Sequence, residues 1–106
     1  MKGTDFGIAV REEMETCWNL LIEKGKEYSE GDEDRLINFK KSAGLQGCTQ
    51  KQALFGMLCK HLASLSEMIM SDEPYGQDRW KEKITDSINY LLILYAMVQE
   101  EKKWKE

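Results

Sequence analysis

The chain has 106 residues, a formal net charge of −4 and 42% hydrophobic residues. This length suits one domain with a thin hydrophobic core. The negative charge argues against a general binder of the nucleic-acid backbone, which is normally basic, but a few local lysines could still hold a small anionic ligand.

The composition favours an all-α protein inside the cell. Pro74 is the only proline, and strand-type alternation of apolar and polar residues is absent. The three cysteines form no CxxC pair, so we expect neither a disulfide framework nor a zinc site. Residues 1–16 are too charged for a signal peptide, and the longest apolar run, Tyr90–Val98, is too short to span a membrane. We therefore expect a soluble cytoplasmic protein without a membrane partner.

The first predicted helix begins at about Thr4 or Asp5 and ends at Tyr28. Its apolar residues recur at steps of three and four, which is the pattern of an amphipathic helix. They are Phe6, Val10, Met14, Cys17, Trp18 and Leu21. Gly25 weakens the last turn, and the polar stretch Ser29–Asp32 is predicted to be a loop.

A short second helix is expected over about Glu33–Ala43. Asp32 could cap its start, and Gly44 suits its C-terminus because glycine adopts the left-handed conformation that ends many helices. Its apolar residues are Leu36, Ile37 and Phe39. The stretch Leu45–Cys48 is predicted to be a loop.

Two long helices complete the chain. Thr49 is suited to cap a helix over about Gln50–Met70, because Gln52 stands three residues on and completes a capping box. After a polar break that contains the proline, Asp78 is predicted to cap the last helix, which runs to about residue 102.

The expected fold is therefore an all-α, four-helix-bundle-like domain with three long helices and one short helix. It forms a single domain over residues 1–106, with its core at about 5–100 and a charged tail at 101–106. Broad apolar faces on such a short chain suggest a homodimer or homotetramer.

The last helix carries a row of oxygen-bearing side chains. Glu82, Asp86 and Asn89 stand at i, i+4 and i+7, so they share one helix face. This row could bind Mg²⁺ or a polar ligand, because a hard cation prefers oxygen ligands. It could equally be an ordinary solvated face.

The third helix carries Lys60, Ser64 and Glu67 at the same spacing, with His61 beside them. If the two helices pack antiparallel, as a short connection allows, Lys60 and His61 would lie opposite Asp86 and form a charged pocket. The alternative is that the charged side chains are solvated and that the lone histidine belongs to the core.

The segment that joins the first two helices is rich in polar groups. Lys26 and Arg35 could hold phosphates, Tyr28 could stack on a base, and the Asn38 amide could read a base or sugar edge. The alternative is a solvated turn whose aromatic side chains pack into the hydrophobic core. The predicted ligand-binding set is Lys26, Tyr28, Arg35, Asn38, Lys60, His61, Ser64, Asp86 and Asn89, and the candidate metal ligands are Glu82 and Asp86.

Four blocks of the chain resemble, in order and spacing, small phage and prophage proteins described as MazG-like or as a nucleotide-modification-associated domain. The blocks are Lys26–Tyr28, Asp34–Phe39, Lys60–Leu65 and Glu82–Leu91, and the resemblance covers about residues 12–98. It implies an all-α fold related to dimeric or tetrameric nucleotide pyrophosphohydrolases. Those enzymes hold Mg²⁺ with an ExxE pair on one helix and an ExxD pair on the next, and cleave nucleoside triphosphates between the α and β phosphates.

The chain departs from that metal pattern. Glu82 and Asp86 are four residues apart rather than three, and the facing helix offers Lys60 and His61 with Glu67 as its only acid. Glu12 and Glu15 form an ExxE, but they lie on the first helix, in the wrong order along the chain. Two carboxylates are too few for a multi-metal site, while lysine and histidine attract phosphate directly.

The sequence therefore predicts a phage-type protein that binds and sequesters a phosphorylated nucleotide or a nucleotide-derived signal, in an anti-defence role in the host cytoplasm. The first alternative is a Mg²⁺-dependent nucleoside triphosphate pyrophosphohydrolase, for which Mg²⁺ would be the cofactor. The second is a helical protein-interaction module. No nucleic-acid polymer is expected as a partner.

Overall fold

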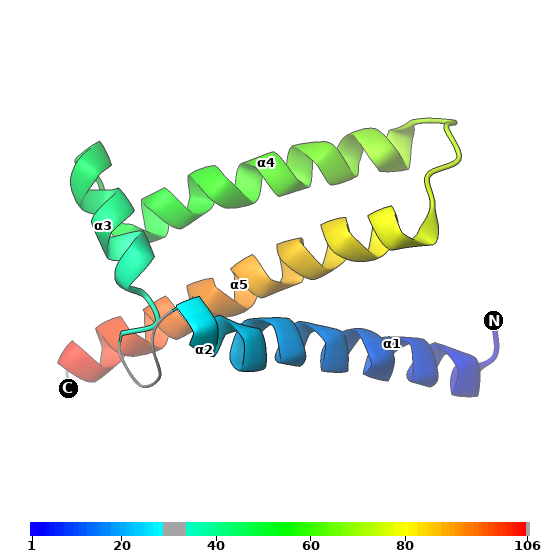
Figure 1. Ribbon diagram of the computed structural model, residues 1–106, viewed down its shortest axis with the longest axis horizontal. Coiled ribbons are helices and arrows are strands. Elements are labelled where there is room, and N and C mark those ends of the chain that lie inside the picture. Colours follow the sequence, from blue (N-terminus) through cyan, green and yellow to red (C-terminus); the bar gives the residue numbers. More distant parts are fainter. Residues whose placement is uncertain (29–33, 106) are drawn as a thin grey trace. The chain divides into compact units, whose positions relative to one another are not determined.

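The structure is a computed structural model that describes the backbone of residues 1–28 and 34–105, and the side chains of residues 1–26 and 34–102. Every regular element in this part of the chain is a helix (Figure 1). The contacts divide the chain into two compact units, Met1–Arg35 and Leu36–Glu106. The prediction of an all-α fold with three long helices and one short helix is confirmed.

The first unit is one continuous helical segment with three parts. They are α1 (Gly3–Trp18), η1 (Asn19–Lys24) and α2 (Gly25–Tyr28). The predicted first helix is therefore present, but its middle part is a π-helix, which the apolar spacing did not indicate. Such wider turns are rare and occur mostly as short insertions in α-helices.

An arginine beyond the helix binds the π-helical part. The Arg35 guanidinium donates a hydrogen bond of 2.6 Å to the Leu21 carbonyl. Its path crosses Gly25, where an added Cβ would overlap the guanidinium. The glycine thus provides the space through which Arg35 reaches the helix backbone.

The apolar stripe predicted for the first helix is largely open to solvent. Phe6, Val10, Met14 and Trp18 are all exposed. The amphipathic pattern therefore predicted the helix correctly, but it did not determine which surface covers this face. The predicted loop Ser29–Asp32, with the proposed cap at Asp32, lies outside the described residues.

The second unit contains α3 (Ile37–Gln46), α4 (Gln50–Met70) and α5 (Gln77–Lys105). Helices α4 and α5 form an antiparallel hairpin, and α3 packs against α4 (Figure 1). A capping box holds the start of α4, as predicted: the Thr49 side chain accepts from the Gln52 N–H at 3.1 Å, and the Thr49 N–H donates to the Gln52 side chain at 2.9 Å.

The boundaries of the short helix were predicted wrongly. It begins at Ile37 instead of Glu33, since the chain forms a turn at Leu36, and Gly44 lies inside it. The helix ends at Gly47, whose φ of 67° is left-handed. Glycine has no Cβ to oppose that conformation, so Gly47, rather than Gly44, terminates α3.

The last helix also differs from the prediction at both ends. It begins at Gln77, so Asp78 lies in its first turn and is not its cap. A carboxylate there still faces the positive end of the helix dipole. The helix continues to Lys105, beyond the predicted end at residue 102.

The core of the second unit lies where the three helices meet. Leu36, Leu54, Leu58 and Met97 are buried together. Partly buried side chains pack around them: Phe39, Tyr90, Ile93 and Leu94. Complete burial of a side chain such as Leu54 stabilises the fold by about 1.5–3 kcal/mol. Apolar burial is therefore the main contribution that holds α4 against α5.

Charged pairs fix the register of the hairpin near the end of α5. Lys51 lies 3.1 Å from Glu101, and Glu100 accepts from Lys40 at 3.0 Å and from the Gln50 amide at 3.3 Å. Such partly exposed pairs contribute little energy each, but they align the start of α4 with the end of α5. His61 therefore comes opposite the stretch of α5 that contains Asp86 and Tyr90.

One described helix, α4, is long and apolar enough to span a membrane by length and composition alone. Core helices of soluble proteins pass the same test, and α4 packs its inner face against α5. Several of its outer side chains are exposed and apolar, among them Phe55, Leu62 and Ile69.

Candidate functional site

A polar cluster interrupts the apolar seam between α4 and α5. His61 Nδ1 lies 3.8 Å from Asp86 Oδ2, and the two side chains are 24% and 39% exposed. That distance is an ion-pair contact when the imidazole is protonated, but it is too long for a hydrogen bond. The two side chains thus meet, as their positions on facing helices suggested, and both remain within reach of solvent.

Aromatic rings support this cluster on its core side. The rings of His61 and Tyr90 are tilted by 34° with centroids 5.0 Å apart, and Phe39 meets Tyr90 edge to face at 6.4 Å. Contacts of this type contribute about 0.5–1.5 kcal/mol beyond burial. Since the three rings come from three helices, they hold the imidazole in place at the edge of the core.

The surroundings of Tyr90 also change the pKa of its hydroxyl. Burial raises the pKa of its phenol above the ordinary value of 10.0, and the negative charge of Asp86 raises it further. Both effects disfavour the phenolate, so Tyr90 stays a neutral hydroxyl near Asp86 at physiological pH.

Two buried polar atoms of the cluster have no hydrogen-bond partner: His61 Nδ1 and Asn89 Oδ1. Leaving such an atom unsatisfied costs about 1–3 kcal/mol, so buried polar groups in proteins are normally paired. Solvent reaches neither atom, so a ligand could supply a partner only where the surrounding side chains move apart.

The remaining predicted residues of α4 and α5 flank the cluster. Lys60 and Glu82 are exposed, and Ser64 is half-buried on the same side of α4 as His61. In the described part of the chain, Lys60 has no salt bridge to hold it. It is therefore a cation next to the cluster that remains available to an anionic ligand.

Asn38 is exposed in the first turn of α3. The α-helix there begins later than predicted, which puts this weak helix former near the start of the helix. It belongs to the same unit as the cluster and adjoins Phe39, which packs on Tyr90.

Three predicted ligand residues belong to the first unit. Lys26 pairs with Glu23 at 3.7 Å on the exposed helix surface, and Arg35 binds the Leu21 carbonyl. Tyr28 ends α2, and its side chain lies outside the described set. The structure thus brings His61, Asp86 and Tyr90 together, with Asn89 three residues after Asp86 on α5, but it does not place Lys26, Tyr28 and Arg35 relative to them.

The acidic residues do not gather into a metal centre. Among the described residues, no group of three or more His, Cys, Asp or Glu side chains could hold a metal ion. The predicted metal ligands Glu82 and Asp86 lie one turn apart on α5, where they offer at most two carboxylates to one ion.

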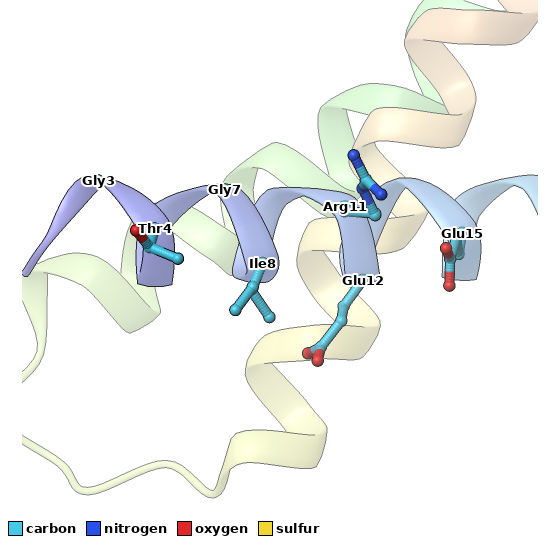
Figure 2. Close-up of a pocket in the computed structure, with 7 residues that line it drawn as sticks. All are labelled: Gly3, Thr4, Gly7, Ile8, Arg11, Glu12 and Glu15. Carbon is cyan, nitrogen blue, oxygen red and sulfur yellow. The ribbon is translucent and has the colours of Figure 1, made fainter.

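A hollow on α1 is formed by a single helix. Figure 2 shows the side chains along it, among them Thr4, Ile8 and Glu12, beside the bare positions Gly3 and Gly7. An added Cβ at either glycine would meet nothing within 4 Å. Ligand sites are concave and enclose most of a ligand, so this open helix surface is not a ligand pocket.

Tyr90 is the site residue that the sequence reasoning missed. It stands four residues after Asp86, so the same spacing argument could have placed it on the inner face of the last helix. The residues that follow it, Leu91 and Leu92, are apolar, and its ring therefore looked like ordinary core.

Comparisons with protein-family models, curated proteins and solved structures found no match to this chain.

Proposed function

We propose that this protein binds a phosphorylated nucleotide at the α4–α5 cluster and holds it without cleaving it. The observation that carries the proposal is the contact between His61 and the partly exposed Asp86 in the seam between α4 and α5. The adjacent Lys60 supplies a cation for phosphate.

The donor set favours binding over hydrolysis. Enzymes that cleave nucleoside triphosphates use metal ions to neutralise the charge that develops on the phosphates. Here the helix facing Asp86 offers a lysine and a histidine. Among the described residues, no three possible metal ligands lie close enough together to hold one ion. The Lys60 ammonium attracts phosphate directly, but it repels a divalent cation.

The resemblance to MazG-like phage and prophage proteins supports a nucleotide as the ligand. In a phage context, a protein that captures a nucleotide without consuming it would deplete a nucleotide-derived signal of the host defence. This role follows from the resemblance, whereas the site itself is argued from the residues of the cluster.

The direct test is to incubate the full chain with a nucleotide panel, separate bound from free ligand, and release the bound fraction by heat. We expect a nucleotide to be retained and returned chemically unchanged. Conversion of the ligand to nucleoside monophosphate and pyrophosphate would overturn sequestration.

A matched pair of serine variants locates the binding site. Ser64→Ala removes a hydroxyl on the His61 side of α4, while Ser66→Ala removes one that is exposed two residues further along. Since residues two apart on a helix face different ways, only Ser64→Ala should weaken binding, by about tenfold for a lost hydrogen bond to a charged group. Equal effects of both variants would place the ligand elsewhere.

The pyrophosphohydrolase remains a second candidate because Glu82 and Asp86 share a helix face. It predicts pyrophosphate release that requires Mg²⁺ or Mn²⁺ and disappears with EDTA and with Glu82→Gln. If no nucleoside triphosphate is turned over under these conditions, the pyrophosphohydrolase is excluded.

The interaction module is favoured by the exposed apolar side chains on the outer faces of α4 and α5, such as Phe55, Leu91 and Tyr95. It predicts that no nucleotide binds and that His61→Ala changes only the free energy of unfolding. Tight nucleotide binding that is lost in His61→Ala, measured by calorimetry, would exclude this alternative.

A further inference from the structure

An uncharged stripe runs along the outside of each helix of the α4–α5 hairpin. Its residues recur at alternating steps of four and three, which is the spacing of a seam between packed helices. The stripe consists of Phe55, Cys59, Leu62, Ser66 and Ile69 on α4, and of Ile84, Ile88, Leu91, Tyr95 and Val98 on α5. All of these side chains except the half-buried Ile88 are exposed.

The two stripes lie on the same side of the hairpin. Each one follows the core residues of its helix by one position: Phe55 comes directly after Leu54 on α4, and Val98 comes directly after Met97 on α5. One position is a rotation of about 100° around a helix. Because α4 and α5 are antiparallel (Figure 1), this rotation turns both stripes toward the same side. Together they form one surface, which we call the hairpin face.

The apolar area of the hairpin face approaches what one partner of a stable complex contributes. Six of its large side chains are 43–64% exposed, namely Phe55, Leu62, Ile69, Leu91, Tyr95 and Val98. With about 200 Å² for a whole aromatic side chain, and somewhat less for an aliphatic one, these six present roughly 600 Å². A standard interface buries about 800 Å² per partner. Apolar patches of this size mark interaction sites.

The charges around the hairpin face favour a protein partner over a membrane. A helix that lies on a lipid surface normally carries many Lys and Arg residues beside its apolar face. Here Lys51, at one end of the hairpin, is paired with Glu101 at 3.1 Å, and the chain has a net charge of −4. The partner surface should itself be apolar and uncharged. A second copy of the chain supplies such a surface of equal length, and two copies of one face can meet about a two-fold axis.

Side-chain size indicates which helices would meet. Between its large residues, α4 carries the small side chains of Cys59, Ala63 and Ser66, and an added Cβ at Gly56 would meet nothing within 4 Å. The stripe of α5 consists only of large side chains. Large residues pack best opposite small ones.

We propose that a second copy of this chain covers the hairpin face, with α5 of each copy over α4 of the other, so that the two hairpins form a four-helix bundle. Antiparallel helix pairs commonly associate in this way. This interface goes beyond the proposed nucleotide binding and does not depend on it.

Two adjacent leucines provide a matched test of the face. Leu91 and Leu92 are 52% and 45% exposed, but Leu92 points about 100° further around α5, away from the hairpin face. In sedimentation equilibrium of the full chain, we expect a dimer that Leu91→Glu weakens at least tenfold and Leu92→Glu leaves intact. Circular dichroism checks that both variants keep their helices. A monomeric wild type, or equal effects of the two variants, would overturn the proposal.

Cross-linking tests the arrangement of the helices. Gln50 contacts Glu100 at 3.3 Å, so Cys59, nine residues further along α4, is about level with position 91 of α5. A two-fold axis along the helices preserves this level between copies. Under mild oxidation Leu91→Cys should therefore give a covalent dimer, which Cys59→Ser abolishes and Leu92→Cys does not form. A covalent dimer that persists in Leu91→Cys with Cys59→Ser would place α5 over α5 and overturn this arrangement.

The remaining occupant is a lipid surface, which flotation with phosphatidylcholine–phosphatidylglycerol vesicles detects. We expect the wild-type chain not to float with the vesicles. A chain that is monomeric in solution, floats with vesicles and loses this binding in Leu91→Glu would show that the hairpin face binds membranes and would overturn the dimer.

Discussion

Tyr90 shows how one residue joins the core of the second unit to the candidate site. Its ring packs between Phe39 and His61, while its hydroxyl experiences the charge of Asp86. A leucine there could fill similar space, but it would provide neither the hydroxyl nor a ring to orient the imidazole. The residue therefore contributes to packing and to the polarity of the site together.

The raised pKa of Tyr90 gives a prediction at the residue scale. In the folded chain we expect Tyr90 to form its phenolate at a higher pH than an exposed tyrosine, because burial and then Asp86 disfavour the anion. Ultraviolet titration with Tyr90→Phe as the reference measures it. In Asp86→Asn the transition should move down but remain above the ordinary value, since burial is the larger cause.

The sign of the stability effect follows from linkage. A phenol whose pKa is raised by folding stabilises the folded state fully below pH 10.0, and this contribution is lost as pH rises through the folded pKa. The free energy of unfolding of wild type relative to Tyr90→Phe should fall above pH 10. A constant difference between the two proteins across that range would show that Tyr90 is unperturbed.

At this scale the sequence was partly sufficient. The spacing of His61 on one helix and Asp86 on the next allowed their encounter to be anticipated, because helix periodicity fixes the face that each occupies. It could not show that Asn89 Oδ1 and His61 Nδ1 lack partners, since hydrogen bonding across the seam depends on angstrom-scale register.

At the scale of single elements, the start of α4 follows from local chemistry. Thr49 and Gln52 satisfy each other's backbone N–H groups. Thr49→Ala should lower the free energy of unfolding by about 1 kcal/mol. Thr49→Ser should keep a free energy of unfolding close to that of wild type, because serine also caps helices. Urea denaturation measures both, and equal stability of Thr49→Ala and wild type would show that the box contributes nothing.

The contact of Arg35 with the π-helical part gives a second prediction at this scale. Alanine is favoured over glycine inside a helix by about 1 kcal/mol, so Gly7→Ala, in open space, should raise the free energy of unfolding. Gly25→Ala should raise the free energy of unfolding by less, because the added Cβ displaces the Arg35 guanidinium from the Leu21 carbonyl.

A double-mutant cycle separates these terms. In an Arg35→Ala background, Gly25→Ala should become as favourable as Gly7→Ala, because no guanidinium remains to be displaced. Urea denaturation of the four proteins gives the coupling free energy. A coupling free energy of zero would mean that the Arg35–Leu21 hydrogen bond does not require a glycine at position 25.

The errors in element boundaries share one physical origin. Gly44 and Gly47 look alike as helix terminators, and only the left-handed backbone at Gly47 distinguishes them. Likewise, the π-helical turns at Asn19–Lys24 have no distinctive composition. Choices between nearly equal local conformations are decided by contacts that a periodicity argument does not contain.

At the scale of the whole molecule, the large apolar side chains that remain exposed on α1, α4 and α5 support the expectation of an oligomer. Sedimentation equilibrium of the full chain should give the mass of a dimer or tetramer. Leu91→Glu and Leu62→Glu place a charge on the outer faces of α5 and α4 and should show which face is involved. A monomeric wild type at micromolar concentration would contradict the prediction.

The sequence by itself determined the class of the fold, the existence of the three long helices and one short helix, and the capped start of α4. These follow from interactions within about four residues: helix periodicity, helix propensity and side-chain capping. The single-domain prediction stays a prediction, because the two units are described separately.

Only the tertiary structure decided which polar groups meet and which stay unsatisfied. The pairs at Glu100 and Glu101 and the buried Leu54 and Met97 set the register of α4 against α5. That register brings His61 to Asp86 and the Tyr90 ring, and leaves the Asn89 carbonyl without a donor. A shift of one helical turn would separate these groups, so the candidate site depends on packing between helices that local sequence patterns do not encode.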